Sequence, residues 1–247
     1  MKEITLAIPF YNTSRYFEEA VSLAIESDFV KEIVVNDDCS QVDEWDNLCT
    51  VVEKLKCDKI KIFRNDENLG GFRNKYTAVK NSTCEWVYLL DSDNNPAEDT
   101  LGIIESIDDP NPDYCYLPQT LLLHKEDGYR DEVNYNFKYD QIGIDEAQDA
   151  LLKRSKYFDW LLNTGNFVFN REAYLERLQG GFDNKDEPVY ACSIAFSYHW
   201  MANGGAYKIV PGMKYYHRLR NDSYWNSCGT NSDLSANYYH QRIINLQ

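Results

Sequence analysis

The sequence predicts an α/β protein with a mostly parallel central sheet flanked by helices. Between residues 4 and 90, short apolar strand-like segments alternate with segments whose apolar residues recur at helical spacing. The segment EWVYLL, residues 85–90, is almost continuously apolar, as expected for a strand buried on both faces. This β-α-β-α-β-α-β order favours parallel strands with helices on both faces of the sheet.

The individual elements follow from this alternation. The predicted strands are residues 4–9, 32–36, 59–63 and 85–90, and the predicted helices are residues 15–27, 42–55 and 72–79. Pro9 should end the first strand, because proline has no N–H for a strand ladder. Ser14 is a suitable N-cap for the first helix.

After residue 110 the pattern is less regular. We expect a strand within 109–123, a loop, strand and short helix within 159–178, a helix within 190–205 and a pair of strands within 206–218. The tail after residue 221 has no clear period, and we predict no element there. Because no repeat or linker divides the sequence, we expect a single domain.

Composition excludes several classes of partner. The chain has 247 residues and a formal net charge of −15, which argues against nucleic acid and anionic membrane surfaces. An anionic ligand would therefore need a metal ion to mediate its binding. No apolar segment is long enough for a transmembrane span, and the N-terminal stretch is too short for a signal peptide. Seven cysteines without a CxxC pattern favour reduced thiols and a cytoplasmic protein.

Polar residues follow each predicted strand, where parallel α/β sheets bind ligands. Asp91 and Asp93 come directly after the apolar fourth strand, and two carboxylates so close together repel unless a positive charge lies beside them. Carboxylates at positions i and i+2 can bind one Mg²⁺ or Mn²⁺ ion. The alternative is an acidic turn formed with the asparagines that follow.

The first two strand exits carry further candidates. Asp38 could accept a hydrogen bond from an imide N–H or a ribose hydroxyl, although the same segment could simply cap the next helix. Tyr11 could stack on a base or could be a partly buried core residue.

The segment ENLGGFRNK joins the third strand to its helix. Gly70 and Gly71 permit close approach of the backbone to a ligand, or make a tight turn. Arg73 lies in the first helical turn, where free N–H groups and a guanidinium could bind phosphate oxygens. His217 has a side chain suited to Mn²⁺, but a lone histidine is more often structural.

Taken together, IPFYN, VVNDDCS, NLGGFRNKYTAVKNS and VYLLDSDN resemble, in order and spacing, the nucleotide-sugar half of family 2 glycosyltransferases with the Rossmann-like GT-A fold. The resemblance covers residues 4–95 well. It is weaker at NTGNFVFNREAYLERLQGGFD and VPGMKYYHRLRNDSYW. It implies that residues 1–95 form a nucleotide-sugar-binding half and residues 96–247 an acceptor-binding and catalytic half.

The resemblance also implies roles for individual residues. Tyr11 would stack on the base and Asp38 would hydrogen-bond it. Gly70 and Arg73 would lie beside the diphosphate. Asp91 would approach the ribose. Asp93 would bind an Mn²⁺ or Mg²⁺ ion, and His217 would complete the metal site.

One feature departs from the family pattern. Family members usually carry an acidic residue, the general base, where the helix that here contains Cys192 begins. The nearest acids in this chain precede that helix, and we assign the base to Asp186 or Glu187. Their alternative is a solvated acidic loop.

These assignments predict a metal-dependent, inverting hexosyl- or N-acetylhexosaminyltransferase. It would move a sugar from a nucleotide-diphosphate donor, with a UDP-sugar favoured, to a hydroxyl of a glycan or glycoconjugate acceptor. One alternative is a nucleotide-sugar-binding module that lacks the base. A sugar nucleotidyltransferase is a weaker alternative, because PFYNTSR is not the long basic glycine-rich loop that such an enzyme carries after its first strand.

Overall fold

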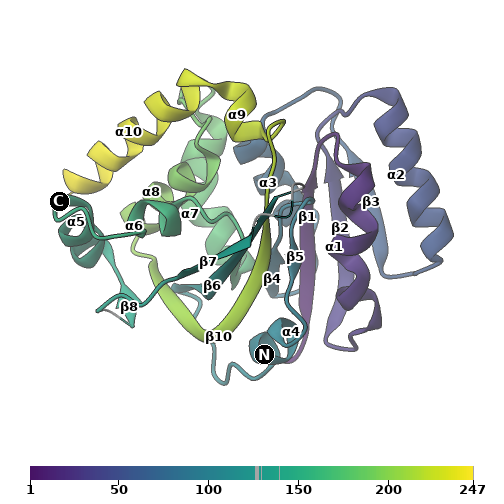
Figure 1. Ribbon diagram of the computed structural model, residues 1–247, viewed down its shortest axis with the longest axis horizontal. Helices are drawn as coiled ribbons and strands as arrows, with labels where there is room; N and C mark the ends of the chain where they lie inside the picture. The colour runs from purple at the N-terminus through teal and green to yellow at the C-terminus, as the bar shows by residue number, and fades with distance from the viewer. Residues whose placement is uncertain (126–127, 129, 139, 247) are drawn as a thin grey trace.

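A computed structural model describes residues 1–125, 128, 130–138 and 140–246. Its central sheet has the order β3-β2-β1-β4-β9-β6-β10-β5, with β7 paired to β6 and β8 paired to β10. The two longest ladders, β1 with β2 and β10 with β6, are parallel, whereas β9 runs antiparallel to both of its neighbours. N-terminal elements occupy one side of the molecule and C-terminal elements the other (Figure 1). This mixed, mostly parallel sheet with flanking helices confirms the predicted fold class.

The predicted N-terminal alternation is confirmed. The strands are β1 (Ile4–Phe10), β2 (Val30–Asp37), β3 (Ile60–Arg64) and β4 (Trp86–Leu89), and the helices are α1 (Ser14–Glu26), α2 (Val42–Leu55) and α3 (Gly71–Lys80). The predicted N-cap is wrong by one residue, because Ser14 is already helical and Thr13 is the N-cap. The Thr13 hydroxyl does not cap the helix but bonds the Ser92 hydroxyl at 2.7 Å.

The C-terminal half contains more elements than the sequence predicts. They are β5 (Asn95–Pro96), α4 (Thr100–Glu105), β6 (Tyr114–Lys125), β7 (Arg130–Asn134), β8 (Gln141–Ile142), α5 (Ile144–Leu152), α6 (Phe158–Leu162), β9 (Phe167–Asn170), α7 (Arg171–Asp183), α8 (Cys192–Ala202), β10 (Ala206–Leu219), α9 (Tyr224–Cys228) and α10 (Thr230–Ile244). The strand within 109–123 and the helix within 190–205 are confirmed as β6 and α8. The predicted loop before β9 contains the short helix α6 instead.

The predicted pair of strands within 206–218 is wrong, because β10 is a single strand. Pro211 and Gly212 resemble a turn in the sequence. In the structure they produce a register shift between Val210 and Lys214, after which the strand continues along β6. Gly212 has φ +80°, so a residue without a side chain permits this irregularity.

Two apolar cores lie on opposite faces of the sheet. One joins the sheet to α1, α2 and α4, and the other joins it to α3, α7, α8 and α10. Alternation within β1 shows the division, since Leu6 and Ile8 belong to the first core and Ala7 to the second. The sheet is therefore covered on both faces, which leaves the carboxyl ends of its parallel strands as the place for a ligand.

Candidate functional site at the carboxyl edge of the sheet

The exits of β1, β2 and β4 lie at one edge of the sheet because these strands are parallel neighbours. Tyr11 follows β1 and its side chain is exposed, with 42% of the residue accessible. Asp38 follows β2 and is tied to the end of β1 by a hydrogen bond from its N–H to the Phe10 carbonyl at 2.9 Å. Asp91 and Asp93 follow β4. The structure thus brings these four predicted site residues to one edge.

Asp38 organises the glycine turn before α3. Its carboxylate accepts hydrogen bonds from the backbone N–H groups of Leu69 at 2.8 Å and Gly70 at 2.9 Å, and from Asn65 Nδ2 at 2.8 Å. Burial raises the pKa of Asp38, and these bonds only partly oppose the rise. Gly70 has φ +80°, a conformation that favours glycine. The predicted contact between Asp38 and a base stays a prediction.

Two later segments cover the start of α3. A Cβ atom at Gly70 would lie 3.5 Å from the Tyr224 hydroxyl of α9, and one at Gly71 would lie 3.4 Å from Cys192 Sγ of α8. The glycine turn, the first turn of α8 and helix α9 therefore meet at this edge of the sheet. The thiol of Cys192 therefore lies at the first residue of α8, close to the glycine turn.

Asp91 forms an ion pair with Lys75, which the sequence reading did not single out. Lys75 Nζ lies 2.7 Å from Asp91 Oδ1, and the lysine side chain is only 10% exposed. Burial lowers the pKa of Lys75, but the attraction of Asp91 and its neighbours outweighs burial and raises it. A Cβ atom at Gly165 would lie 2.8 to 3.0 Å from Ser193 Oγ, Lys75 Nζ and Asp91 Oδ2, so these polar groups converge above that glycine.

Asp93 is paired with Arg220, another residue that the sequence reading missed. Arg220 Nε donates to Asp93 Oδ2 at 2.8 Å, and their side chains are 8% and 16% exposed. Burial and the nearby charge of Asp91 raise the pKa of Asp93, and Arg220 opposes them. Arg218 Nε also donates to the Asp93 carbonyl at 3.0 Å. Both arginines come from the end of β10 or just beyond it, a position that no local motif in the sequence reveals.

His217 lies beside this pair. Burial lowers the pKa of His217, and Asp93 and Asp91 oppose that shift. Its Nδ1 is 3.4 Å from the Tyr215 hydroxyl. An uncharged imidazole next to a carboxylate is a donor set that suits Mn²⁺. Among the residues that the structure describes, no three His, Cys, Asp or Glu side chains are grouped as a metal site. The predicted binding of a cation by Asp93 and His217 stays a prediction.

Arg73 lies at the edge of the site but contacts another part of the chain. Its Nη2 donates to the Asn184 carbonyl at 2.7 Å, and its Nε donates to the Phe182 carbonyl at 3.3 Å. The guanidinium thus fastens the segment after α7 to the first turn of α3. Its predicted place beside a diphosphate stays a prediction.

The two candidate bases lie in different environments. Asp186 is exposed, on the loop that Arg73 holds at Asn184. The Glu187 side chain is buried, with Oε2 3.3 Å from His199 Nε2. Burial raises the pKa of Glu187, but the proximity of His199 and Tyr239 outweighs burial and lowers the pKa. The Glu187 carboxylate is therefore engaged within the chain, whereas that of Asp186 faces solvent.

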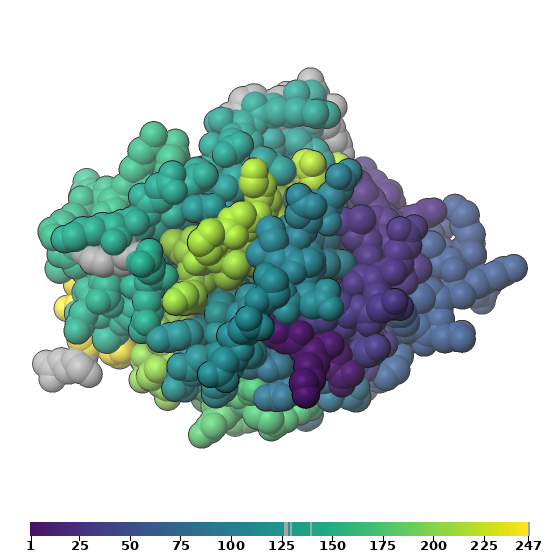
Figure 2. Space-filling view, turned by 90° about the horizontal axis from the view of Figure 1, so that it is seen from below, coloured from purple at the N-terminus to yellow at the C-terminus, as the bar shows by residue number. Residues whose placement is uncertain are grey.

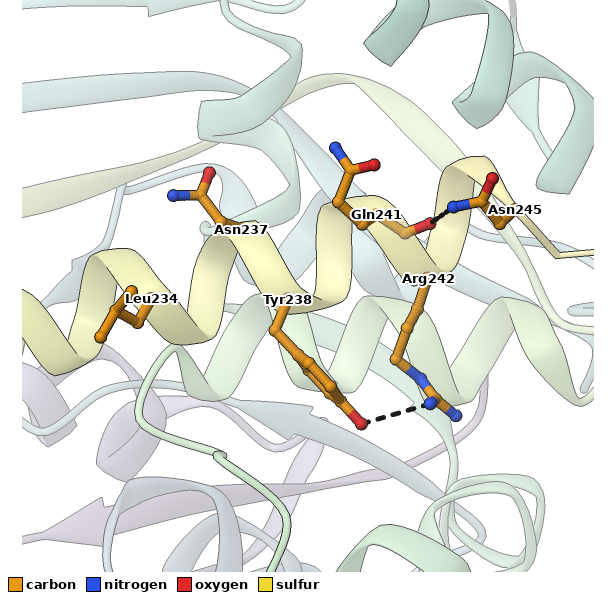
Figure 3. Close-up of a pocket in the computed structure, with 6 residues that line it drawn as sticks. All are labelled: Leu234, Asn237, Tyr238, Gln241, Arg242 and Asn245. Carbon is orange, nitrogen blue, oxygen red and sulfur yellow. Dashed lines mark hydrogen bonds between the residues drawn. The ribbon is translucent and has the colours of Figure 1, made fainter.

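A shallow hollow of about 460 Å³ lies on the outer face of α10, away from these residues. Figure 3 shows that five of the six labelled residues belong to this one helix and that the sixth, Asn245, follows its last residue. The Arg242 guanidinium points to the Tyr238 hydroxyl, with Nη1 3.2 Å from the hydroxyl oxygen. Arg242 also donates to the Tyr198 hydroxyl at 2.5 Å. The bond to Tyr198 attaches α10 to α8. None of the predicted site residues lines the hollow.

No helix in the described ranges is both long enough and apolar enough to span a bilayer.

Comparison with known sequences gives one matching family and one similar protein. The profile of the family described as Glycosyl transferase family 2 matches residues 5–178. The poly(ribitol-phosphate) beta-N-acetylglucosaminyltransferase TarS of Staphylococcus aureus, strains Mu50 and MW2, is 31% identical over 106 residues, which is 41% of this chain. The match covers only 18% of the length of TarS.

Comparison with solved structures gives the same fold. S. aureus TarS 1-349 in complex with UDP-GlcNAc aligns with a TM-score of 0.64 and 18% identity, over 99% of this chain and 67% of that one. GalNAc-T7 with UDP, GalNAc and Mn²⁺ aligns with a TM-score of 0.58 and 17% identity, over 89% of this chain and 44% of that one. The structural alignments show that the fold is shared with these proteins. The family profile spans more than half of the sequence. The chain therefore belongs to glycosyl transferase family 2.

Proposed function

We propose that the chain transfers a sugar from a UDP-sugar to a hydroxyl group of a glycan or glycoconjugate, with inversion at the anomeric carbon. The observation that carries this proposal is the convergence of Tyr11, Asp38, Asp91 and Asp93 at one edge of a family 2 fold. The similarity to TarS, solved with UDP-GlcNAc, supports an N-acetylhexosamine donor. In this proposal residues 1–95 bind the donor, and residues 96–247 bind the acceptor and supply the base within a single domain.

The donor site uses groups that the fold already orients. The exposed ring of Tyr11 stacks on the base, and Asp38 bonds the base while holding the Gly70 turn. Asp91, fixed by Lys75, accepts a hydrogen bond from a ribose hydroxyl. Arg73 and the N–H groups at the start of α3 approach the diphosphate.

Asp93 and His217 would hold Mn²⁺ or Mg²⁺ in this proposal. A cation bound there would neutralise charge on the departing diphosphate, which explains how a chain with a net charge of −15 accepts an anionic donor. Arg220 balances the charge of Asp93 in the structure. It must therefore share or release that carboxylate when a cation binds.

A carboxylate on the loop before α8 removes the proton from the acceptor hydroxyl. Asp186 and Glu187 both remain candidates, and solvent exposure favours Asp186 because the Glu187 carboxylate already contacts His199. Asp186→Asn should lower kcat at least 100-fold if Asp186 is the base. In that case Glu187→Gln should lower the free energy of unfolding and leave kcat nearly unchanged. A large loss of kcat in Glu187→Gln, with Asp186→Asn still active, would assign the base to Glu187.

The proposal is tested by incubating the chain with UDP-GlcNAc, Mn²⁺ and candidate glycan acceptors and measuring released UDP. Asp93→Ala should abolish turnover while the circular dichroism spectrum stays unchanged. Near wild-type transfer by Asp93→Ala would remove the metal assignment. Asp99→Ala, at the N-cap of α4, is a matched control that should keep its activity.

A nucleotide-sugar-binding module is the second candidate. The thiol of Cys192 at the start of α8, where family members usually carry the base, is the observation that favours it. Thermal stabilisation by UDP and Mn²⁺, with no UDP released from any UDP-sugar and acceptor pair, would support this candidate over the transferase.

A further inference from the structure

A groove lies beside the donor site, on the other face of the sheet. It has a volume of about 580 Å³, within the range of about 300 to 1,000 Å³ that is common for ligand sites. Its walls come from α1, β5, β6, β7 and β10 and include Glu19, Asn95, His124, Arg130, Glu132 and Tyr216. We call this the β10 groove. Figure 2 shows residues of β10 and the segment after it as a yellow-green band at the surface between teal segments.

Strand alternation separates the β10 groove from the donor site. Tyr215 is fully buried in the core that joins the sheet to α3 and α8. His217 follows it on the same face and contacts the Tyr215 hydroxyl. Tyr216 therefore points to the opposite face, where it lines the groove and meets the His124 ring edge-on at a centroid distance of 6.1 Å.

Two polar atoms of the groove residues are buried without a hydrogen-bond partner. Within the described part of the chain, Asn95 Oδ1 and His124 Nε2 have none. An unpaired buried polar atom costs about 1 to 3 kcal/mol, so a ligand whose binding turns such an atom toward the groove gains by pairing it. Burial lowers the pKa of His124, which favours an uncharged imidazole. A hydroxyl group can donate to the Asn95 oxygen and can also serve either tautomer of the imidazole.

The charges of the β10 groove do not favour an anion. Glu19, Asp131 and Glu132 contribute three carboxylates to its lining, against the guanidinium of Arg130 in the lining and that of Arg218, which is paired with Glu19. The exposed Tyr216 ring, with 38% of the residue accessible, offers an apolar face beside these acceptors. A ligand with many hydroxyl groups, a C–H face and no charge matches this lining best.

We propose that the β10 groove binds a neutral oligosaccharide. The sugar would stack on Tyr216 while its hydroxyl groups pair with Asn95, His124 and the surrounding carboxylates. The choice of a glycan over another uncharged polyol rests on the proposed glycosyl transfer. The groove adjoins the donor site, because Arg218 donates both to Glu19 at 2.7 Å and to the Asp93 carbonyl at 3.0 Å. A glycan held there lies next to the chemistry without occupying the donor pocket.

Titration with cellotriose, maltotriose and chitotriose, followed by saturation-transfer NMR and calorimetry, tests this proposal. We expect saturable binding of at least one trisaccharide. Tyr216→Ala should weaken that binding at least 10-fold, and Tyr216→Phe, which keeps the ring, should stay within about threefold of wild type. Glu132→Ala, on an exposed strand, provides a second variant that should fold normally and also bind more weakly.

Two outcomes would overturn the β10 groove as a glycan site. They are the absence of saturable binding for all three trisaccharides, and binding that neither Tyr216→Ala nor Glu132→Ala weakens. Asp93→Ala separates this proposal from the transferase proposal, since it should abolish UDP release yet keep trisaccharide affinity within about twofold. Trisaccharide binding by a chain that never turns over a UDP-sugar would refute glycosyl transfer and leave the groove assignment standing.

Discussion

Lys75 and Asp91 form a largely buried ion pair at the candidate site, with 2.7 Å between their charged atoms. Removing one partner of a buried pair leaves the other charge uncompensated. The loss of Lys75 should therefore affect both stability and the position of the Asp91 carboxylate. No local pattern distinguishes Lys75, because a lysine inside a helix usually points to solvent.

Lys75→Met should lower the free energy of unfolding by about 3 kcal/mol, because Asp91 is left without its cation in a mostly buried setting. Urea denaturation measures the change. The double variant Lys75→Met, Asp91→Asn should recover much of the loss, since it removes both charges. Wild-type stability of Lys75→Met alone would show that the pair contributes little.

The pKa of Glu187 is lowered in the folded chain, chiefly because His199 outweighs the effect of burial. A carboxyl whose folded pKa is depressed stabilises the fold above its unfolded pKa, and this stabilisation is lost as the pH falls through the folded pKa. The stability difference between wild type and Glu187→Gln should therefore be constant at neutral pH and shrink as the pH drops below the ordinary glutamate value. Urea midpoints measured from pH 7 to pH 3 test this. A difference independent of pH would exclude a titrating Glu187.

At the scale of elements, α8 joins the site to the core. Its first residue, Cys192, lies beside Gly71, while Phe196 one turn later stacks on Phe167 at a centroid distance of 4.6 Å and on Trp200 at 5.7 Å. Stacked aromatic residues hold the helix axis against β9. The position of α8, which begins at the site, therefore depends on the packing of Phe196 one turn along the helix.

Phe196→Ala should destabilise the fold by about 3 to 5 kcal/mol, because it opens a cavity inside this aromatic cluster. Phe63→Ala is the matched control, since Phe63 is exposed and should change stability by less than about 0.5 kcal/mol. Thermal and urea denaturation of both variants give the comparison. Equal effects would show that the cluster does not hold α8.

The elements that could be predicted from the sequence are those whose apolar residues recur at regular spacing. The N-terminal strands and helices have such spacing, and their alternating order predicts the parallel part of the sheet. Helix α10 did not, because its buried stripe includes Ser232 and Ser235, which carry no apolar signal. Ser235 joins distant segments instead, accepting from the Ala191 N–H at 2.9 Å and donating to the Pro188 carbonyl.

At the scale of the whole molecule, the site combines residues that lie far apart in the sequence. Asp91 and Asp93 could be chosen locally, since a buried strand ends just before them. Their partners could not, because Arg220 is more than a hundred residues away in the chain and reaches Asp93 only through the pairing of β10 with β5 and β6. Cys192, Asp186 and Glu187 were visible in the sequence, but the burial of Glu187 against His199 and the exposure of Asp186 depend on tertiary contacts.

In the proposed function a divalent cation would join Asp93 to the diphosphate of the donor. A crystal of the chain with UDP and Mn²⁺, with anomalous diffraction recorded at the manganese edge, tests this metal site. We expect a manganese peak bonded to an Asp93 oxygen, the His217 imidazole and phosphate oxygens, with Arg220 shifted from its present contact. A UDP molecule bound at this edge with no manganese at Asp93 would contradict it.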